Sequence, residues 1–593
     1  MRGLTRLGVA LMLSCSLLLR TTLGFAAEAG GYQLQTNVSI PLRDGVKLAA
    51  TLYRPRDANT RHPVLFTLTP YSADSYHERP AFFARNGYAF LLIDSRGRGN
   101  SGGKFDPLRQ EANDAHDVVE WLHKQPFSNG QVSMWGGSYA GYNQWMAASK
   151  QPDGLFSIVP VASPYPALDF PTNRNVGYPY LMRWLTLTSG ALSQNNLFGD
   201  DAFWSASALP TYRGERPYAE LDQIVGNPLK IFQEWIKHPH PDAYWDAFVP
   251  TDAEMAAIDL PILSITGTYD GDQPGALEFY RRHMSLAPAQ AKSKHYLLIG
   301  PWDHAGTRTP RKKVGGLTFG DASLLDLNQL HLQWYQFARG LGARPKLLAS
   351  HVTFYITGAE TWRSADSLDA VTQARTTLYL GSPGINPDRA FRSGDLLASA
   401  DANSGVDHFS YDPLDFRRAD IEAADKNGDL SSQRIALSIN GDGLMYMSDA
   451  VKAPTILSGR PSAALYLSTD VPDTDISMVL YEITAAGNSV LLSYDTVRLR
   501  YRESLRQVKP YTPGQIEKVE FKGFTFFAHQ LAVGSRLRLL ITAPNSPTVQ
   551  KNFNSGGIVA LETAKDARIA TINIHLDKDH PSQLSLPMGV QDN

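Results

Sequence analysis

Short, nearly continuous apolar runs recur through the first 300 residues of the chain. They cover residues 64–68, 88–93, 156–162, 260–265 and 296–299. Runs of this length are typical of strands that are buried on both faces of a parallel sheet. Segments with apolar residues at helical spacing lie between them, such as AHDVVEWLHKQ at 115–125. The alternation predicts an α/β fold, preceded by a hairpin that turns at Arg43-Asp44-Gly45.

The alternation of strand-like and helix-like segments is interrupted by two regions of different composition. Residues 165–251 are rich in aromatics and prolines, with helix-like pieces such as PLKIFQEWIKH, which predicts a helical cap inserted between two strands. From residue 350 onward, alternating and β-branched segments such as SAALYLST and ISMVLYEI are separated by Gly, Pro and Asp turns. This pattern of short strands and turns predicts a β-sandwich or jelly roll. The predicted organisation is an α/β domain in two parts (28–164 and 252–349), the cap (165–251) and the jelly roll (350–593).

The N-terminal segment is typical of a secretory signal peptide. Two arginines precede an apolar stretch at 7–19, and small residues follow up to the expected cleavage site after Ala26 or Ala27. The stretch is too short to span a bilayer. Lipid modification of Cys15 ranks lower, because leucines follow it where a polar tether is expected. Removing residues 1–27 deletes the only cysteine, so we expect a periplasmic or secreted protein without disulfides or thiolate chemistry.

Charge and composition exclude several classes of partner. The formal charge is −2, or −5 once the three arginines of the signal segment are removed, and no run of Lys and Arg stands out. We therefore expect no nucleic-acid partner. No metal or cofactor is expected, and no membrane association after signal cleavage. Homo-oligomerisation is left open.

One serine lies in the setting that nucleophilic catalysis requires. In SMWGGSYAGYNQW, Ser138 follows a predicted strand and precedes a predicted helix, and small neighbours let the backbone bend sharply. The general nucleophile-elbow motif has glycine two residues after the serine, where this chain has Ala140 and then Gly141. Taken alone, the stretch is equally compatible with an ordinary turn.

Two further segments supply partners for this serine. Asp270 and His304 each follow the carboxyl end of a predicted parallel strand, in the order serine, acid, histidine that α/β hydrolases use. His304 would take the serine proton, and Asp270 would orient the imidazole. The alternatives are His238 and His240, which lie in the predicted cap without a preceding strand, and Asp303, which is adjacent to His304 in sequence.

Acyl transfer also requires donors to the developing oxyanion. The backbone N–H of Tyr139, directly after the serine, is one expected donor. A second donor is expected from the loop Thr69-Pro70-Tyr71, which follows the first strand of the α/β domain. The residues alone favour an ordinary half-buried tyrosine at position 71.

Together these motifs resemble a known family, the bacterial cocaine esterases, α-amino-acid ester hydrolases and X-Pro dipeptidyl-peptidases. The resemblance covers nearly the whole mature chain. Its motifs are TPY (69–71), DSRGRGNSGG (94–103), EWLHKQP (120–126), GGSYAG (136–141), YDG (269–271), GPWDH (300–304), GAETWR (358–363), STDVPDTD (468–475) and LRYRES (499–504). The family's elbow is similar to G-x-S-Y-x-G, which accommodates Gly141. The resemblance also implies that Tyr71 is the side-chain oxyanion donor, and it implies a helical cap and a C-terminal jelly roll.

The substrate is less well indicated. In the amino-ester hydrolases that this chain resembles, a cluster of carboxylates holds the substrate ammonium, and two of these carboxylates closely follow the catalytic aspartate. In this chain Asp272 matches the first of the two, and Gln273 replaces the second. Asp272 is a candidate ammonium ligand, although the residues alone favour a solvated loop acid. Trp184, with other cap aromatics, could line an acyl pocket or form the core of the cap. We expect a serine hydrolase acting on small esters or activated amides. The alternatives are an X-Pro dipeptidyl-peptidase, an α-amino-acid ester hydrolase or acylase, and a non-catalytic carbohydrate- or partner-binding protein on a hydrolase scaffold.

Overall fold

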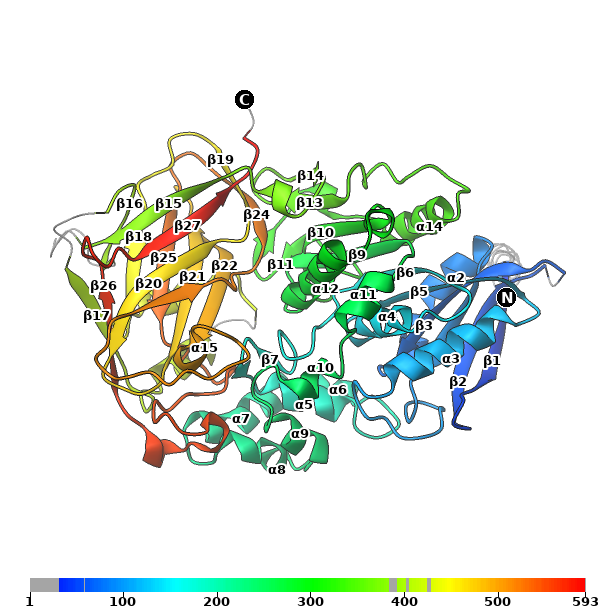
Figure 1. Ribbon diagram of the computed structural model, residues 1–593, viewed down its shortest axis with the longest axis horizontal. Helices are drawn as coiled ribbons and strands as arrows, with labels where there is room; N and C mark the ends of the chain where they lie inside the picture. The colour runs from blue at the N-terminus through cyan, green and yellow to red at the C-terminus, as the bar shows by residue number, and fades with distance from the viewer. Residues whose placement is uncertain (1–30, 58, 383–391, 401–404, 424–427, 592–593) are drawn as a thin grey trace, which may run out of the picture.

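The computed structural model describes residues 31–57, 59–382, 392–400, 405–423 and 428–591. The predicted signal peptide, residues 1–27, lies outside this range. The described chain forms a mixed α/β domain, a set of short helices and a β-rich domain (Figure 1). The predicted α/β fold with a cap and a C-terminal β domain is confirmed.

The first domain is built on a ten-stranded sheet in which seven adjacent strands run parallel, as the apolar runs predicted. Strands β1, β2 and β14 are antiparallel to their neighbours and complete its edges. In spatial order the strands are β1 (Tyr32–Pro41), β2 (Lys47–Pro55), β4 (Ala89–Asp94), β3 (His62–Thr69), β5 (Ser128–Gly137), β6 (Leu155–Val161), β9 (Ile262–Tyr269), β10 (His295–Asp303), β13 (Val352–Ile356) and β14 (Thr361–Ala365).

Helices cover both faces of this sheet. Because side chains alternate along a strand, Val64 and Phe66 of β3 pack with α3 (Glu111–His123) and α4 (Tyr139–Ser149), whereas Leu65 packs with α2 (Glu78–Arg85) and α14 (Leu327–Ala338). Both faces of the central strands are therefore buried, which explains their continuous apolar sequences. Helix α12 (Gln273–Leu286) follows β9 and carries the contact to the β-rich domain.

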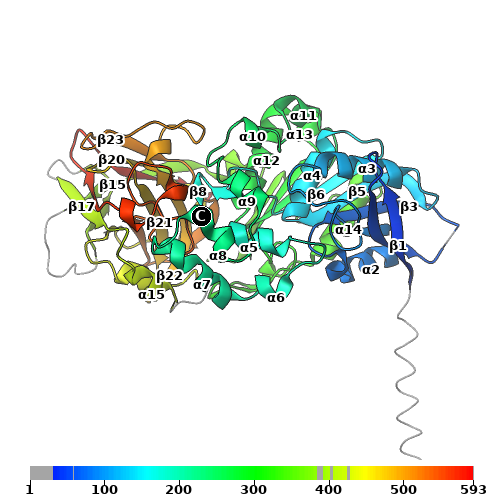
Figure 2. The same cartoon turned by 90° about the horizontal axis from the view of Figure 1, so that it is seen from below.

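The cap lies between β6 and β9 in sequence. It begins with a two-stranded hairpin, β7 (Thr172–Asn173) and β8 (Val176–Gly177), and continues as short helices. These are α5 (Tyr180–Leu187), α6 (Asn195–Phe198), α7 (Asp201–Tyr212), α8 (Leu221–Ile224), α9 (Lys230–Trp235) and α10 (Ala243–Asp246). Seen from below, several of the cap helices lie over the junction of the two larger domains (Figure 2). Helix α11 (Asp252–Ala257), by contrast, packs on α12 and α4 of the first domain.

The β-rich domain packs its own apolar core between strands that pair antiparallel, except for the parallel pair β16 and β18. The strands are β15 (Ala374–Gly381), β16 (Gly394–Leu397), β17 (Val406–Tyr411), β18 (Gly443–Met447), β19 (Thr455–Gly459), β20 (Ser462–Thr469), β21 (Asp475–Ile483), β22 (Ser489–Arg498), β23 (Glu517–Phe521), β24 (Phe527–Leu531), β25 (Arg536–Thr542), β26 (Ala570–His575) and β27 (Gln583–Met588). The helix α15 (Arg417–Ala423) lies beside the cap helix α7, because Phe416 packs against Tyr212.

The border between the two sheets does not lie at the predicted domain start, residue 350. Strands β13 and β14 lie beyond that residue but extend the first sheet beside β10. The second sheet begins at β15, because Ala374 pairs with the C-terminal strand β27. The two domains are joined by main-chain contacts: the Thr357 amide donates to Ala528 at 3.1 Å, and the Gln530 amide donates to Thr357 at 2.8 Å. Within the described ranges, no helix is long and apolar enough to cross a membrane.

Candidate active site

Ser138 occupies a strained turn between β5 and α4. Its backbone adopts φ 61° and ψ −128°, a region that non-glycine residues rarely occupy. The conformation is held because the Ser138 amide donates to the Val161 carbonyl of β6 at 2.9 Å, while the Ser138 carbonyl accepts from the first turn of α4. The serine hydroxyl therefore projects at the carboxyl end of the parallel sheet.

The surrounding glycines are required by close packing. A Cβ on Gly136 would lie 2.6 Å from the Cβ of Ala140, and one on Gly141 would lie 2.6 Å from the Val161 carbonyl oxygen. Gly141 is therefore the residue that lets α4 approach β6, and Ala140 is tolerated because Gly136 leaves room for its methyl group. This packing explains why the glycine after the serine is displaced by one position.

His304 and Asp270 meet beyond the ends of β10 and β9. The Nδ1 atom of His304 lies 2.8 Å from Oδ1 of Asp270, whose carboxylate also accepts from the Thr266 hydroxyl and the Asp272 amide. Burial disfavours the charged forms of both Asp270 and His304. The attraction between carboxylate and imidazolium outweighs this cost, so the pKa of Asp270 lies below its ordinary value and the pKa of His304 lies above it.

The rival residues have other partners. Asp303 accepts from the Gly306 amide and pairs with Arg311, each at 2.7 Å. His238 lies 2.7 Å from Asp242 of the cap, and His240 contacts Tyr501 of the β domain. None of the three rivals is among the described residues that line the cavity at Ser138.

Tyr71 lies beside the serine. Its hydroxyl is 3.2 Å from Ser138 Oγ, and the Trp184 indole N–H donates to it at 3.0 Å. The Trp184 N–H donates to a lone pair of the Tyr71 oxygen. The Tyr71 O–H proton therefore remains free to be donated toward Ser138. Burial raises the pKa of Tyr71 to about 12, so this hydroxyl stays protonated over the working range of most hydrolases.

Tyr139 contributes differently through its backbone and its side chain. It is the first residue of α4, where N–H groups have no intrahelical acceptor. Its ring stacks on Trp184 with centroids 5.5 Å apart, and its hydroxyl accepts from the Leu108 amide and donates to Glu111. Burial raises the pKa of Glu111 to about 7. The side chain thus anchors the elbow and the cap aromatic to the first domain.

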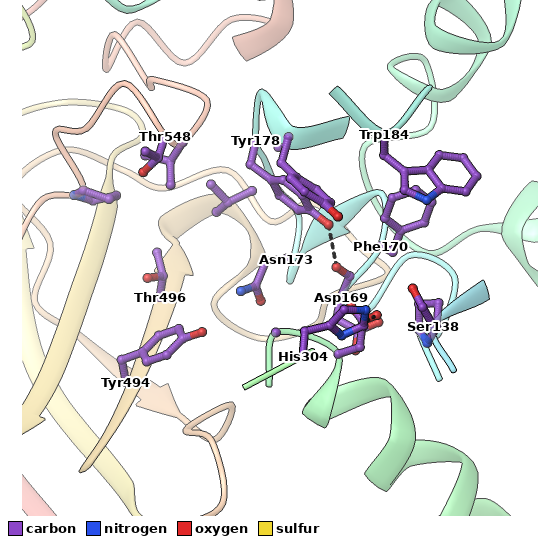
Figure 3. Close-up of a pocket in the computed structure, with 18 of the residues that line it drawn as sticks. Ser138, Asp169, Phe170, Asn173, Tyr178, Trp184, His304, Tyr494, Thr496 and Thr548 are labelled. Atoms are coloured by element: carbon purple, nitrogen blue, oxygen red, sulfur yellow. Dashed lines mark hydrogen bonds and ion pairs between the residues drawn. The ribbon is translucent and has the colours of Figure 1, made fainter. Parts of the chain in front are cut away.

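Tyr71, Ser138, Tyr139 and His304 line one cavity of about 570 Å³, drawn in Figure 3. The α/β domain supplies Tyr71, Ser138 and His304, and the cap supplies Phe170, Tyr178 and Trp184. The β domain closes the side opposite the serine, where Figure 3 shows Tyr494, Thr496 and Thr548. A cavity of this size with a largely aromatic wall suits a small organic molecule.

Two more carboxyl groups border the cavity. The Asp272 carboxylate lies 3.7 Å from His304 Nδ1, and burial, reinforced by Asp169 and Asp270, raises the pKa of Asp272 well above its ordinary value. Burial also raises the pKa of Asp169 to about 8, although the amides of Tyr165 and Gly275 donate to its oxygens.

Comparison with known proteins identifies relatives of both large domains. Residues 44–306 match the X-Pro dipeptidyl-peptidase (S15) family, and residues 348–585 match the X-Pro dipeptidyl-peptidase C-terminal non-catalytic domain. The chain belongs to this family of serine hydrolases. It is 27% identical to a cocaine esterase of Rhodococcus sp. over 94% of this chain and 99% of that protein. It is 22% identical to a putative serine esterase of Mycobacterium bovis, over 93% and 94% respectively.

Solved structures share the whole architecture. An α-amino acid ester hydrolase superposes with a TM-score of 0.81 at 22% identity, covering 95% of this chain and 97% of that one. An aminopeptidase from a marine sediment Thaumarchaeota archaeon superposes with a TM-score of 0.77 at 21% identity, covering 94% and 96%. At these identities the likeness establishes the fold.

Sequence reasoning missed some residues at the serine-hydrolase cavity. Asp169 lies in the irregular start of the cap, where no strand or motif marks it. Tyr494 and Thr496 belong to β22, whose alternation predicts a strand but not which surface it faces. Arg308, in the turn after His304, does not line the cavity, but its side chain approaches Gly137 so closely that a Cβ there would lie 2.5 Å from Nη1. Only the positions of these residues in the fold connect them to Ser138.

Proposed function

We propose that this protein hydrolyses small carboxylic esters through an acyl-enzyme on Ser138. The observation that carries the proposal is the convergence of a strained serine, the His304–Asp270 pair and the Tyr71 hydroxyl on one aromatic cavity. The esterase relatives support the same reaction class.

The proposed chemistry uses these groups in a fixed order. With Nδ1 held by Asp270, the imidazole of His304 has Nε2 left to accept the Ser138 proton as Oγ attacks the ester carbonyl. The same nitrogen then protonates the leaving alcohol. In the second half-reaction His304 activates water, which attacks the acyl-enzyme and releases the acid. Asp270 stabilises the imidazolium form in both halves.

The developing oxyanion would be stabilised by the Tyr71 hydroxyl and the Tyr139 amide. Tyr71 donates its proton to the substrate oxygen while Trp184 continues to donate to the tyrosine oxygen, which polarises the O–H bond. This arrangement assigns Trp184 a positioning role in addition to its place in the cavity wall. The Tyr139 amide is fixed at the start of α4, and the Trp184 N–H holds the Tyr71 hydroxyl, so both donors need little reorganisation.

Recognition of an α-amino acyl group is a second candidate, favoured by the acids beside the triad. Asp272 would receive the ammonium, because Asp169 already accepts two backbone amides. A cation there would oppose the raised pKa of Asp272 and form a charge-assisted hydrogen bond. An X-Pro dipeptidyl-peptidase remains the alternative for amide substrates.

A substrate panel tests the proposal. Parent enzyme and Ser138→Ala would be assayed on p-nitrophenyl butyrate, a phenylalanine ester, its des-amino analogue and an X-Pro anilide. We expect hydrolysis of the simple ester by the parent alone. A preference for the aminoacyl ester over its des-amino analogue that disappears in Asp272→Asn would establish the second candidate. Hydrolysis of the anilide alone would overturn the esterase assignment in favour of a peptidase.

We further propose that the chain is exported through its N-terminal segment and acts in the periplasm or outside the cell. The support is the arrangement of two arginines, an apolar stretch and small residues at 1–27. Sequencing the N-terminus of the protein purified from a periplasmic extract tests this proposal. A mature terminus at residue 27 or 28 is expected, and an uncleaved cytoplasmic product would contradict it.

A further inference from the structure

A second cavity, of about 580 Å³, lies at the contact between α12 and the β domain. Its walls come from α12, from the segment 368–375 that enters β15, and from the turn between β19 and β20. The lining residues are Arg281, Leu368, Asp369, Thr372, Gln373, Ala374, Arg375, Gly459, Arg460, Pro461, Ser462, Lys522 and Phe526. None of these residues lines the cavity of Ser138.

The charge of this cavity is strongly unbalanced. Four of its lining residues are cationic, and one, Asp369, is acidic. Two of the cations have partners, since Arg375 donates to the Arg460 carbonyl at 3.1 Å and Lys522 pairs with Glu520.

The guanidinium groups of Arg281 and Arg460 have no such partner. Within the part of the chain that the structure describes, neither group makes a hydrogen bond or an ion pair, and Nε of Arg460 is buried. Burial, together with the charges of Arg281 and Arg174, lowers the pKa of Arg460 to about 9. A buried donor without an acceptor is costly, so Nε of Arg460, with the unpaired guanidinium of Arg281 in the same cavity wall, points to a ligand.

Neighbouring acids do not neutralise the pair by direct contact. Glu278 lies one helical turn before Arg281, yet no ion pair within 4.0 Å joins Glu278 or Asp369 to either arginine among the described residues. Asp495 is engaged by Arg174 at 3.3 Å and by the Gly523 amide at 2.7 Å.

We propose that this cavity binds a small multivalent oxyanion, such as inorganic phosphate, between Arg281 and Arg460. Guanidinium groups present paired N–H donors that match the oxygens of phosphate, sulfate and carboxylate. One oxyanion would satisfy both arginines and remove their mutual repulsion.

The position of the site indicates what binding would do. Arg281 belongs to α12, whose first residue, Gln273, exchanges two hydrogen bonds with the backbone of Phe526. Arg460 belongs to the β domain, in the turn after β19. A bound anion would therefore connect α12 to the β domain and stabilise their contact, without touching the residues proposed for catalysis.

Isothermal titration calorimetry with sodium phosphate, against sodium chloride at matched ionic strength, tests the proposal. Parent, Arg281→Gln, Arg460→Gln and the exposed control Arg344→Gln would be compared. We expect saturable phosphate binding near one site per chain in the parent and the control. Each cavity variant should bind at least about tenfold more weakly, because a hydrogen bond to a charged group is lost. Sulfate and citrate titrations identify which oxyanion geometry is preferred.

Thermal unfolding distinguishes loss of the site from loss of the fold. In chloride buffer, both cavity variants should melt at or above the parent temperature, because each removes one of two partly buried charges that repel each other. Phosphate should then raise the melting temperature of the parent and of Arg344→Gln, but not of the cavity variants. Phosphate binding that is absent in the parent, or unchanged in both cavity variants, overturns the proposal. Destabilisation of Arg281→Gln in chloride without phosphate binding by the parent would instead indicate an ion pair with Glu278.

Discussion

Tyr71→Phe isolates the proposed side-chain oxyanion donor. The substitution removes one hydroxyl and leaves the ring, so the packing of the cavity wall is kept. In the structure that hydroxyl lies 3.2 Å from Ser138 Oγ and accepts from Trp184. Because the bond to the substrate oxygen strengthens as negative charge develops, the loss should appear in kcat far more than in KM. One preorganised donor is worth roughly 10²–10³-fold in kcat, or about 3–4 kcal/mol.

The variant also leaves the Trp184 indole N–H without its acceptor. Trp184 is 4% exposed, so we expect a cost of about 1–3 kcal/mol in folding stability unless water enters the cavity. For a chain of this length that corresponds to a decrease of only a few degrees in melting temperature.

Steady-state hydrolysis of p-nitrophenyl butyrate and a melting curve for each variant form the assay. Trp184→Phe is the control, because it keeps the Tyr71 hydroxyl and removes the indole N–H that donates to it, together with part of the ring that packs on Tyr139 and Phe170. We expect a smaller kcat loss there than in Tyr71→Phe. A Tyr71→Phe enzyme whose kcat stays within a few-fold of the parent would refute the reasoning and leave the oxyanion to backbone donors alone.

Four further variants test neighbouring parts of the account. Asp270→Asn should lower kcat by about 10⁴-fold, because the imidazole of His304 loses its orienting carboxylate; near-normal turnover would exclude that role. Asp272→Asn should move the acid limb of the kcat/KM profile to lower pH, because a nearby carboxylate raises the pKa of His304 and activity requires its neutral form; an unmoved limb would contradict this. Gly141→Ala should cost about 1–3 kcal/mol of stability and impair activity, since its Cβ would meet a β6 carbonyl at 2.6 Å. Ala140→Gly should retain activity at a helix cost of about 1 kcal/mol; equal behaviour of the two would refute the packing argument.

Much of the α/β domain could be predicted from sequence because burial on both faces leaves an unmistakable pattern. The apolar runs correspond to β3, β4, β6, β9 and β10. The positions of Asp270 and His304 after two such strands then follow from the geometry of parallel sheets. Their 2.8 Å contact required the fold, since β9 and β10 are adjacent only in the assembled sheet.

The domain border and the far wall of the cavity could not be predicted in the same way. Strands β13 and β14 lie near the end of the first sheet, and β14 is only half-buried, so their sequences resemble those of the β domain that follows. The contribution of Tyr494 to the cavity depends on how the β domain packs against the cap. The hydrophobic periodicity of a strand such as β22 cannot predict a contact with residues that lie more than 300 positions earlier in the chain, as Ser138 does.

Covalent labelling of the nucleophile tests the central claim most directly. The folded parent and the Ser138→Ala variant would be treated with a fluorophosphonate, digested and examined by peptide mass spectrometry, with melting curves confirming that both are folded. The account predicts a single adduct on Ser138, loss of esterase activity in proportion to labelling, and no adduct on the variant. An adduct on another serine that accompanies inactivation, or equal labelling of Ser138→Ala, would contradict it.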